Sequence, residues 1–361
     1  MTDLDNVLAG GLLGAVSSAD EFADVRALVD ELSQRSFDAR LGRRRRPEAF
    51  DGPLWNALQD TGLARLTSDA ENGAGPADLA VVLYGLARRS AAVPVAETDL
   101  LAAWLGQQAG VDVPIAGPLT AARTTGAVRD GIVTGTATGV PWARAADALV
   151  LLIDTGASHY VGAFGVDGLV TDAMNLAGEP RDDVGFGLPL ARLTSVGAAL
   201  ADEFDCRGAW ARCIQIVGAL DAAAASAVTH CRERVQFGRP LSRIQSVQQA
   251  LATMAGDIER GRAAVTLAVA AAIDFGFGSG RTEYAVAVAK AVLGPVVAAV
   301  TTAAHQLHGA IGTSVEHPLW ASTLRARSWT DEFGSAGHHA RRVGHLALSC
   351  NNVWDCVTGR F

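Results

Sequence analysis

Four long apolar segments in the last part of the chain restrict its fold more than any other feature. They are rich in Ala, Val and Leu, and they occupy residues 209–236, 242–275, 282–308 and 336–356. Each is longer than the mean helix of globular proteins, which has about 11–12 residues. Long helices with short connections are typical of an antiparallel bundle. We therefore predict a C-terminal helical bundle domain over residues 201–361.

The first part of the chain also favours helices. Apolar side chains recur at helical spacing over residues 22–32. Pro53 and Gly62 are placed to begin and end a second helix, because Pro suits a first helical turn and Gly a helix end. We predict an N-terminal helical domain over residues 1–110.

The region between the two has a different pattern. Apolar runs become short, at residues 132–133, 148–153 and 160–164, and Gly, Asp and Pro separate them. This is typical of strands, so we predict a small middle β domain over residues 111–200. The fold class is then mainly α with a middle β domain.

Composition excludes several classes of function. The chain is 49% hydrophobic and carries a net charge of −8, which argues against nucleic acid or an anionic membrane as partner. Five Cys without a CxxC spacing indicate reduced thiols, as in the cytoplasm. Lys290 and Gly294-Pro295 interrupt the most apolar stretch, which favours a buried core helix over a membrane span. We expect a cytoplasmic protein without a membrane span.

One polar motif follows the first bundle segment. Residues 232–241 read RERVQFGRPL, an Arg-rich helix end that breaks at Phe237-Gly238. A guanidinium, an amide and an aromatic ring brought together in this way can bind a phosphate and a planar ring. The same pattern also fits an ordinary helix C-terminus with favourable cations and a Gly stop.

A second motif follows the third bundle segment. Residues 305–320 read HQLHGAIGTSVEHPLW, in which Gly309 and Gly312 allow a backbone to approach a ligand closely. Taken alone, it is equally a helix that ends in Gly. His338, His339 and His345 lack the accompanying Cys, Asp or Glu spacing of a metal site, so no metal is predicted.

Together the two motifs resemble the C-terminal domain of the acyl-CoA dehydrogenase family, whose members show Arg-x-x-Phe-Gly and later Gln-x-x-Gly-Gly-x-Gly. The resemblance extends through the chain, at Leu54-Trp55 with Gly62-Leu63 and at residues 135–140 and 145–151. It implies FAD as cofactor, an acyl-CoA substrate, a role in lipid metabolism and an electron-transfer flavoprotein as acceptor. The family order of helical domain, β domain and four-helix bundle agrees with the organisation predicted above.

The resemblance also implies which residues bind the cofactor. In the family the C-terminal motifs reach across a subunit interface to the FAD of a neighbour. By position, Arg234 would meet the pyrophosphate, with Gln236 and Phe237 beside it. The adenosine end would be lined by Gln306, Leu307, His308, Gly309 and Ala310, with Ile311 and Gly312 completing the turn. Gln245 and Ser335 are further candidates.

The catalytic base of the family is missing at its usual positions. The family reaction is α,β-dehydrogenation, in which a carboxylate removes the α-proton while a hydride passes to the flavin. Most members place that Glu before a Gly-Thr pair, where this chain has Phe333-Gly334-Ser335; some place it near Gly208. The catalytic residue therefore stays unassigned, and the candidates for a relocated base are Glu332, Asp331 and Asp205.

The β region lacks a second family motif, a Thr-Glu-Pro segment followed by Gly-Ser that holds the isoalloxazine; residues 117–126 read GPLTAARTTG. Elements given to a neighbour are kept and elements serving the chain's own flavin are missing. One interpretation is a subunit that completes the FAD site of a second acyl-CoA dehydrogenase-like chain in a heterotetramer. Such pairs resemble those of actinobacterial steroid degradation.

Three alternatives stay open. The chain could be an active homotetramer or homodimer with a relocated carboxylate. It could be a non-catalytic structural or regulatory member of the family. It could also use the same fold for flavin oxidation or monooxygenation.

Overall fold

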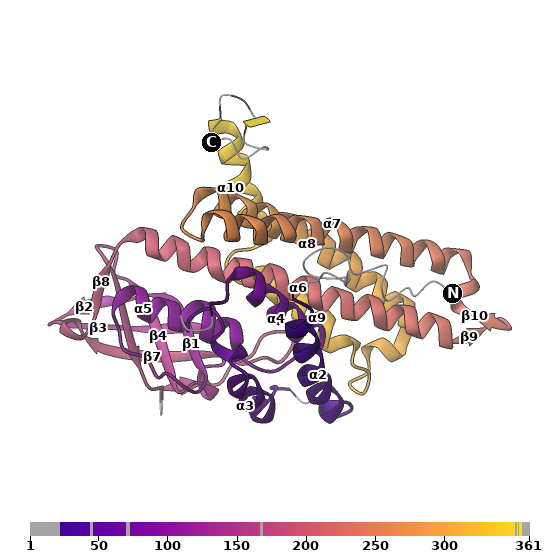
Figure 1. Ribbon diagram of the computed structural model, residues 1–361, viewed down its shortest axis with the longest axis horizontal. Coiled ribbons are helices and arrows are strands. Elements are labelled where there is room, and N and C mark those ends of the chain that lie inside the picture. Colours follow the sequence, from indigo (N-terminus) through magenta and orange to yellow (C-terminus); the bar gives the residue numbers. More distant parts are fainter. Residues whose placement is uncertain are drawn as a thin grey trace.

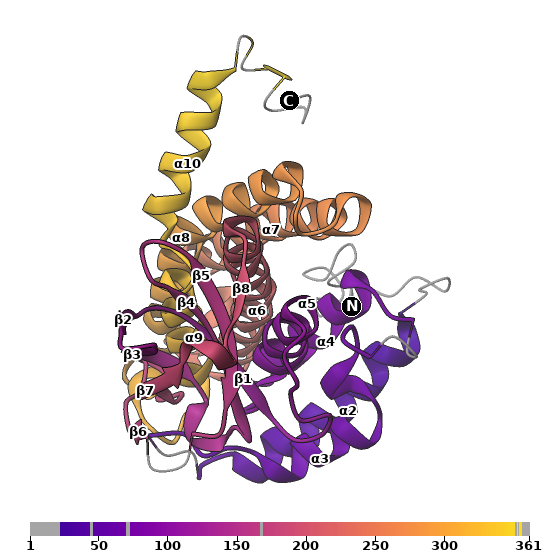
Figure 2. The same ribbon diagram turned by 90° about the vertical axis from the view of Figure 1, so that its left-hand side faces the viewer.

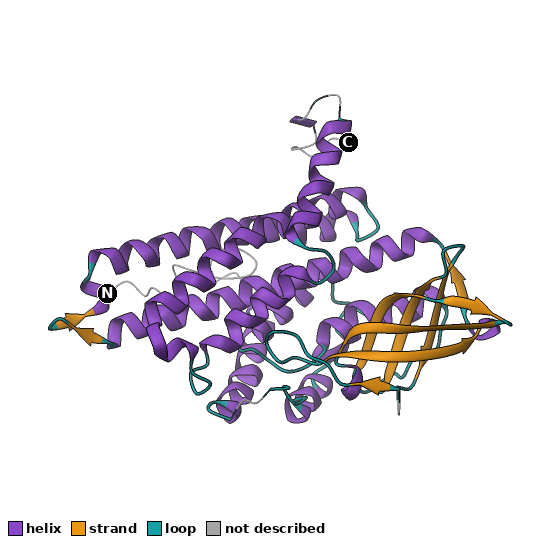
Figure 3. Cartoon of the chain, turned by 180° about the vertical axis from the view of Figure 1, so that it is seen from behind, coloured by secondary structure: helices purple, strands orange, loops and turns teal. Residues whose placement is uncertain are grey.

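The computed structural model describes residues 22–43, 46–69, 73–166, 169–350, 352, 354 and 355. Strands gather at one end of the molecule, and long helices run from there to a small hairpin at the opposite end (Figure 1; Figure 3). The N-terminal helices lie beside the first long bundle helix (Figure 2).

In the N-terminal region, residues at the helix ends determine where the helices begin and end. The side chain of Asp51 accepts a hydrogen bond from the Leu54 amide, Pro53 lies in the first turn, and Gly62 takes a positive φ of 76°. A one-turn 3-10 helix follows, and a π-helix with buried Glu97 and Asp99 comes later. The elements are α2 (Ala23–Arg40), α3 (Gly52–Asp60), η1 (Leu63–Arg65), α4 (Pro76–Arg88), η3 (Ala96–Ala103) and α5 (Trp104–Ala109).

The middle region consists of two four-stranded sheets, ordered β1-β4-β5-β8 and β2-β3-β7-β6. Strands β1 and β4 pair in parallel, with Leu119 opposite Ala148; the other pairs are antiparallel. The strands are β1 (Leu119–Thr125), β2 (Ala127–Arg129), β3 (Ile132–Pro141), β4 (Ala148–Asp154), β5 (His159–Phe164), β6 (Val170–Thr171), β7 (Arg181–Pro189) and β8 (Thr194–Val196). One-turn 3-10 helices lie at Ala143–Ala145 and Leu190–Arg192.

Strand β4 joins the two sheets to the helices. Its apolar residues are all buried, and they alternate because successive side chains of a strand point to opposite faces. Leu149, Leu151 and Ile153 pack between the sheets, whereas Val150 and Leu152 pack against α5 and the π-helix. A continuous apolar run is the expected sequence of a strand covered on both faces.

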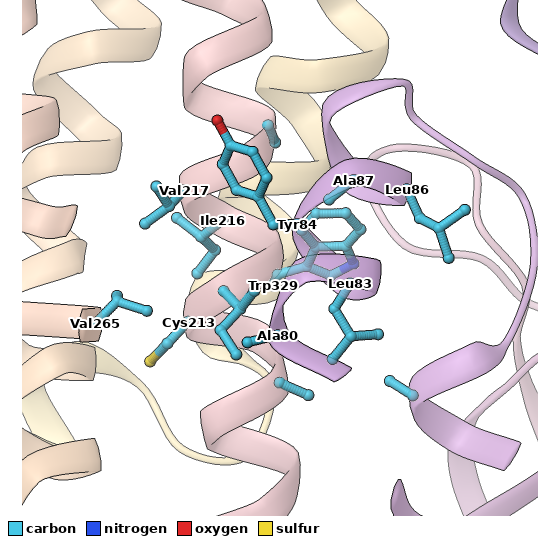
Figure 4. Packing of buried hydrophobic residues seen from close by; sticks show 14 of the residues in the cluster. Ala80, Leu83, Tyr84, Leu86, Ala87, Cys213, Ile216, Val217, Val265 and Trp329 are labelled. Carbon is cyan, nitrogen blue, oxygen red and sulfur yellow. The ribbon is translucent and has the colours of Figure 1, made fainter. Parts of the chain in front are cut away.

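The C-terminal region is a bundle around α6 (Ala198–Glu233). This helix contacts α4, α7, α8 and α9, and its small residues allow close approach: Gly218 packs against the backbone of α4. Tyr84, Ile216, Val217, Val265 and Trp329 lie in the resulting core (Figure 4). The remaining elements are β9 (Val235–Gln236), β10 (Arg239–Pro240), the 3-10 helix Leu241–Arg243, α7 (Gln245–Phe275), α8 (Gly280–His308), η7 (Gly309–Thr313), α9 (Leu319–Asp331) and α10 (Ala336–Ser349).

Most predicted elements correspond to observed ones, with two clear differences. The first bundle helix begins at Ala198 instead of residue 209 and ends at Glu233 instead of 236. An additional helix, α9, lies between the third and fourth predicted segments. It was missed because it carries Arg325, Arg327 and several hydroxyl residues instead of an apolar stripe. The last helix ends at Ser349, and most residues beyond Cys350 lie outside the described part.

The strands predicted at 132–133, 148–153 and 160–164 match β3, β4 and β5, but the five other strands of the middle region and the β9–β10 hairpin were not predicted. The domain limits at residues 110 and 200 stay predictions. Two helices, Ala198–Glu233 and Gly280–Thr313, have the length and composition of a membrane span; 72% and 50% of their most apolar windows are buried. Buried core helices meet the same criteria, so this observation is weak evidence for a membrane, and the absence of a span stays a prediction.

Candidate functional site

A cavity of about 710 Å³ opens between the ends of α6, α7 and α8, near the β9–β10 hairpin. Most of the cofactor residues predicted from the two motifs line it, although the motifs lie about seventy residues apart in sequence. They are Arg234, Gln236, Gln306, Leu307, His308, Gly309 and Ala310. Residues from α7, including Ser246 and Val247, complete the wall. The fold therefore brings both motifs to one site.

The local backbone explains how Arg234 reaches the cavity. Arg234 is the C-cap of α6, and its amide donates to the carbonyl of His230 at 2.9 Å. The Leu241 amide in turn donates to the Arg234 carbonyl at 2.9 Å, which closes the hairpin behind it. Phe237 and Gly238 both have positive φ, at 53° and 74°, and form the hairpin tip. The side chain of Phe237 is 88% exposed and does not line the cavity.

The glycine-bearing turn after α8 needs glycine at two positions. Gly309 has a φ of 65°, a backbone conformation that costs other residues energy. A Cβ at Gly312 would lie 2.7 Å from the Cβ of His308, closer than real side chains approach. The turn can therefore hold the end of α8 tightly while its backbone faces the cavity.

Besides Phe237, two further predicted cofactor residues lie apart from the cavity wall. Gln245 is the first residue of α7 and is not among the lining residues. Ser335 is the N-cap of α10, where its hydroxyl accepts a hydrogen bond from the His338 amide at 3.2 Å. His230 does line the cavity and was missed, although its position four residues before Arg234, on the same helix face, is a signal that could have found it.

The two positions where the family places its base meet in space. The ring of Phe333 covers Gly208 so closely that a methyl group added at Gly208 would overlap it. Phe333 has a φ of 55°, which turns the loop between α9 and α10 inward, and its ring packs on Phe204 with centroids 6.1 Å apart. An aromatic ring thus occupies the place of the family carboxylate, and a ring carbon cannot accept a proton.

Glu332 does not replace that base. Its carboxylate accepts hydrogen bonds from Nε of Arg181 at 2.8 Å and from Nε of Arg212 at 2.6 Å. Burial by itself raises the pKa of Glu332, but the two guanidinium groups outweigh burial and hold the pKa below its ordinary value. Lys290 also fixes this loop, since its ammonium donates to the carbonyls of Thr330 and Glu332 at 2.8 and 2.7 Å. A permanently paired carboxylate is a poor general base.

The pairs around Glu332 extend into a buried charge cluster, which we define as Glu48, Glu97, Glu179, Arg181, Arg212, Arg325 and Glu332. Arg212 donates to Glu97 at 2.6 Å, and Arg325 donates to Glu179 at 3.1 Å and forms a further pair with Glu48. The members come from the N-terminal, middle and C-terminal regions. Next to the cluster, a cavity of only about 20 Å³ remains, lined also by Trp142 and Trp329. That is room for about one water molecule.

The other two base candidates have different surroundings. Asp331 is exposed at the end of α9. Asp205 lines a cavity of about 240 Å³ together with Phe333, and Nη1 of Arg123 donates to its carboxylate at 2.5 Å. Burial raises the pKa of Asp205, and the Arg123 charge opposes that effect. Of the three candidates, Asp205 combines access to a cavity with a raised pKa.

Comparison with known proteins agrees with these features. Residues 197–345 match the family model for the acyl-CoA dehydrogenase C-terminal domain. The chain is similar to the acyl-CoA dehydrogenase FadE27 of Mycobacterium tuberculosis, at 26% identity over 93% of this chain and 95% of that protein. These matches support an acyl-CoA dehydrogenase family member, with the family's C-terminal domain matched over residues 197–345.

Two further likenesses, one of sequence and one of fold, are consistent with these matches. It is 34% identical to the probable acyl-CoA dehydrogenase FadE2 of M. tuberculosis over 49% of this chain, and that match spans 40% of the relative's length. It shares the fold of a chain in the crystal structure of the ChsE4-ChsE5 complex from M. tuberculosis, with a TM-score of 0.79 at 23% identity over 94% of this chain and 99% of that chain. The predicted family and fold class are confirmed, and at family level so are the oxidoreductase class and the flavin cofactor.

Proposed function

We propose that this chain completes the FAD site of a second acyl-CoA dehydrogenase-like subunit, and that the pair carries out α,β-dehydrogenation of an acyl-CoA thioester. One observation carries the proposal. The motifs expected to serve a neighbour's cofactor line an open cavity of about 710 Å³, whereas the expected position of the chain's own base holds Phe333, whose ring packs on Gly208 and Phe204.

The residues around the large cavity fit a dinucleotide. Arg234 supplies a guanidinium for phosphate oxygens, Gln236 and Gln306 supply amide donors and acceptors, and the Gly309 turn exposes backbone to a flat group. None of the described residues that line the cavity is a carboxylate, so nothing there repels a diphosphate. FAD, when bound, supplies the hydride acceptor of the reaction. This chain's part is to hold and orient the phosphates and to shield them from water.

The surroundings of Gly208 and Phe333 support an active site to which two subunits contribute different residues. The two base candidates near Phe333 are both paired with arginines: Glu332 is held by Arg181 and Arg212, and Asp205 accepts from Arg123. The base and the acyl pocket would then come from the partner. The likeness to a chain of the ChsE4-ChsE5 complex, which pairs two different proteins, is compatible with such an assembly.

The remaining parts of the proposal follow the family. Electrons would pass to an electron-transfer flavoprotein, and the protein would act in the cytoplasm on an acyl group of steroid or other lipid origin. The acidic net charge of −8 and the absence of a CxxC pair are compatible with the cytoplasm.

A second candidate is an active homo-oligomer that uses Asp205 as base. The observation in its favour is that Asp205 and Phe333 share the cavity of about 240 Å³ and that burial raises the pKa of this carboxyl. In this case Asp205→Asn abolishes turnover of the purified single chain, and Asp202→Asn on the same helix turn, outside that cavity, does not.

The decisive test is the visible absorbance of the chain purified alone and after co-expression with the partner gene. We expect flavin only in the co-expressed complex. Arg234→Ala in this chain should lower the flavin content of the complex at least several-fold, because a charge-assisted pair to phosphate is lost. Arg232→Ala, an exposed arginine of the same helix end that lies outside the cavity, is the matched control. Stoichiometric flavin in the chain alone would contradict the proposal.

A further inference from the structure

Two histidines form part of the large cavity beside Arg234. His230 comes from the last turn of α6 and His308 from the last turn of α8. Their rings stack with centroids 4.7 Å apart and planes inclined by 24°. His317 lies edge-on to His308, with its centroid 4.9 Å from that of His308, and is outside the cavity lining. The stacked pair His230 and His308 forms part of the wall of the site proposed above for a diphosphate.

The hydrogen bonds of His308 fix its protonation. Nδ1 lies 2.7 Å from the carbonyl of Ala304, which can only accept, so Nδ1 carries the proton. Nε2 lies 3.1 Å from the Ser226 hydroxyl and accepts from it. Burial lowers the pKa of His308, which favours the neutral form of this ring. His308 is a fixed platform and not the group that changes charge.

His230 has the opposite properties. Its ring is half-buried, lines the cavity and makes no hydrogen bond among the described residues. Both nitrogens can therefore exchange a proton with solvent. Imidazole is the side chain whose charge changes most readily near neutral pH, and a ring that faces the cavity without a hydrogen-bond partner can interact with an anion that fills it.

The surrounding charges decide when His230 gains a proton. Arg234 on α6 is the only charged side chain among the described lining residues, and it disfavours a second cation while the cavity is empty. On the neighbouring elements the titratable groups are His305 on α8 and His317 before α9, and the pKa of each is lowered, mainly by burial. Arg327 on α9 faces His305, and the carboxylates Glu233 and Glu316 are exposed and outside the lining. No carboxylate in the wall can neutralise His230⁺.

We propose that His230 is a proton-linked ligand of the dinucleotide diphosphate, taking up one proton from solvent as the diphosphate binds beside Arg234, with His308 as the positioning residue that holds its ring. The inference rests on the proposed function. The phosphates of FAD stay fully ionised through the physiological pH range, so any change of affinity in that range comes from the protein. An opposite charge within about 4–6 Å favours the charged form of a group by about one to three pKa units, and each unit corresponds to tenfold in affinity.

The experiment measures FAD dissociation from the co-expressed complex at pH 6 and pH 8 by the recovery of flavin fluorescence. Calorimetry in two buffers of different ionisation enthalpy counts the protons taken up. We expect the Kd to be about tenfold lower at pH 6 than at pH 8, with proton uptake on binding. His230→Gln should show no change of Kd between the two pH values. The matched control is His345→Gln, an exposed histidine on α10 that should retain the full pH dependence.

Three results would overturn the inference. A wild-type Kd that is equal at both pH values would do so, as would a His230→Gln protein that keeps the wild-type dependence. Both outcomes leave the proposed function standing, because FAD still binds. A complex without FAD at either pH would overturn the proposed function as well.

Discussion

The two ends of α6 differ more than any other pair of regions in this molecule. Towards its N-terminal end, Gly208 lies against Phe333, which lines a cavity of about 240 Å³, and Arg212 lies in the buried charge cluster beside a cavity of about 20 Å³. At the other end, His230 and Arg234 face a cavity of about 710 Å³. Arg212 and Arg234 are separated by about 33 Å along the helix axis, at about 1.5 Å per residue.

The two regions differ in whether their arginine is buried and paired with carboxylates. Arg212 is 2% exposed and bonds Glu97, Glu332 and Gln215. Arg234 is exposed, and no carboxylate pairs with it among the described residues. A buried arginine with all its partners present stabilises a closed arrangement, whereas an open one is available to an anion. The same helix therefore carries a buried, paired arginine at Arg212 and an exposed arginine at Arg234 beside the large cavity.

The largest effect should come from breaking the closed end. Arg212→Ala leaves Glu97 and Glu332 buried without their common partner, so we expect the free energy of unfolding to fall by about 3–5 kcal/mol. Urea denaturation measures it. Arg35→Ala removes an exposed pair with Glu31 on α2 and should cost less than about 1 kcal/mol. If both substitutions cost the same, the charge cluster does not hold the closed end together.

The second effect concerns pH at the same end. Burial raises the pKa of Glu179, but Arg181 and Arg325 outweigh it and hold the pKa at about 2. A lowered folded-state pKa stabilises the fold above the unfolded value of about 4.3 and loses that contribution as the pH falls. We expect about 3 kcal/mol of stability to disappear between pH 4.5 and pH 2.

Urea denaturation at several pH values checks this prediction, and Glu179→Gln should flatten the profile in that window. Glu31→Gln, at an exposed pair on α2, should leave the profile unchanged. An acid profile that Glu179→Gln does not alter would show that other carboxylates carry the loss.

The third effect tests the contact that replaces the base. Gly208→Ala places a methyl group into the Phe333 ring, so we expect it to cost about 1–3 kcal/mol. In the Phe333→Ala background the same change should cost little, since the ring is gone and Ala favours a helix. Additive costs in this double-mutant cycle would mean that the two residues do not touch. Gly256→Ala on α7, where an added Cβ meets no atom, is the control.

These regions also differ in how far the sequence alone could predict them. The open cavity was predictable, because RERVQFG and HQLHGAIG are local motifs and each carries its residues on a helix end. Counting along the chain identified Phe333 and Gly208 as the two positions where the family base is expected. The contact between Phe333 and Gly208 was not predictable, because it depends on the positive φ of Phe333 and on α9. The charged residues of α9 interrupt the apolar pattern from which a helix would be predicted.

The buried charge cluster could not have been predicted. Arg212 and Glu97 lie 115 residues apart in sequence, and Arg181 and Glu332 lie 151 apart. Each of these residues, taken singly, fits an exposed position, since charged side chains are seldom buried. Only the three-dimensional fold shows that they satisfy one another.

The most direct test of the account is the flavin content of the purified chain, measured from its visible absorbance with and without the co-expressed partner. The account predicts no stoichiometric flavin in the chain alone, flavin in the complex, and loss of that flavin with Arg234→Ala in this chain. A yellow, flavin-saturated single chain whose flavin survives Arg234→Ala would contradict it.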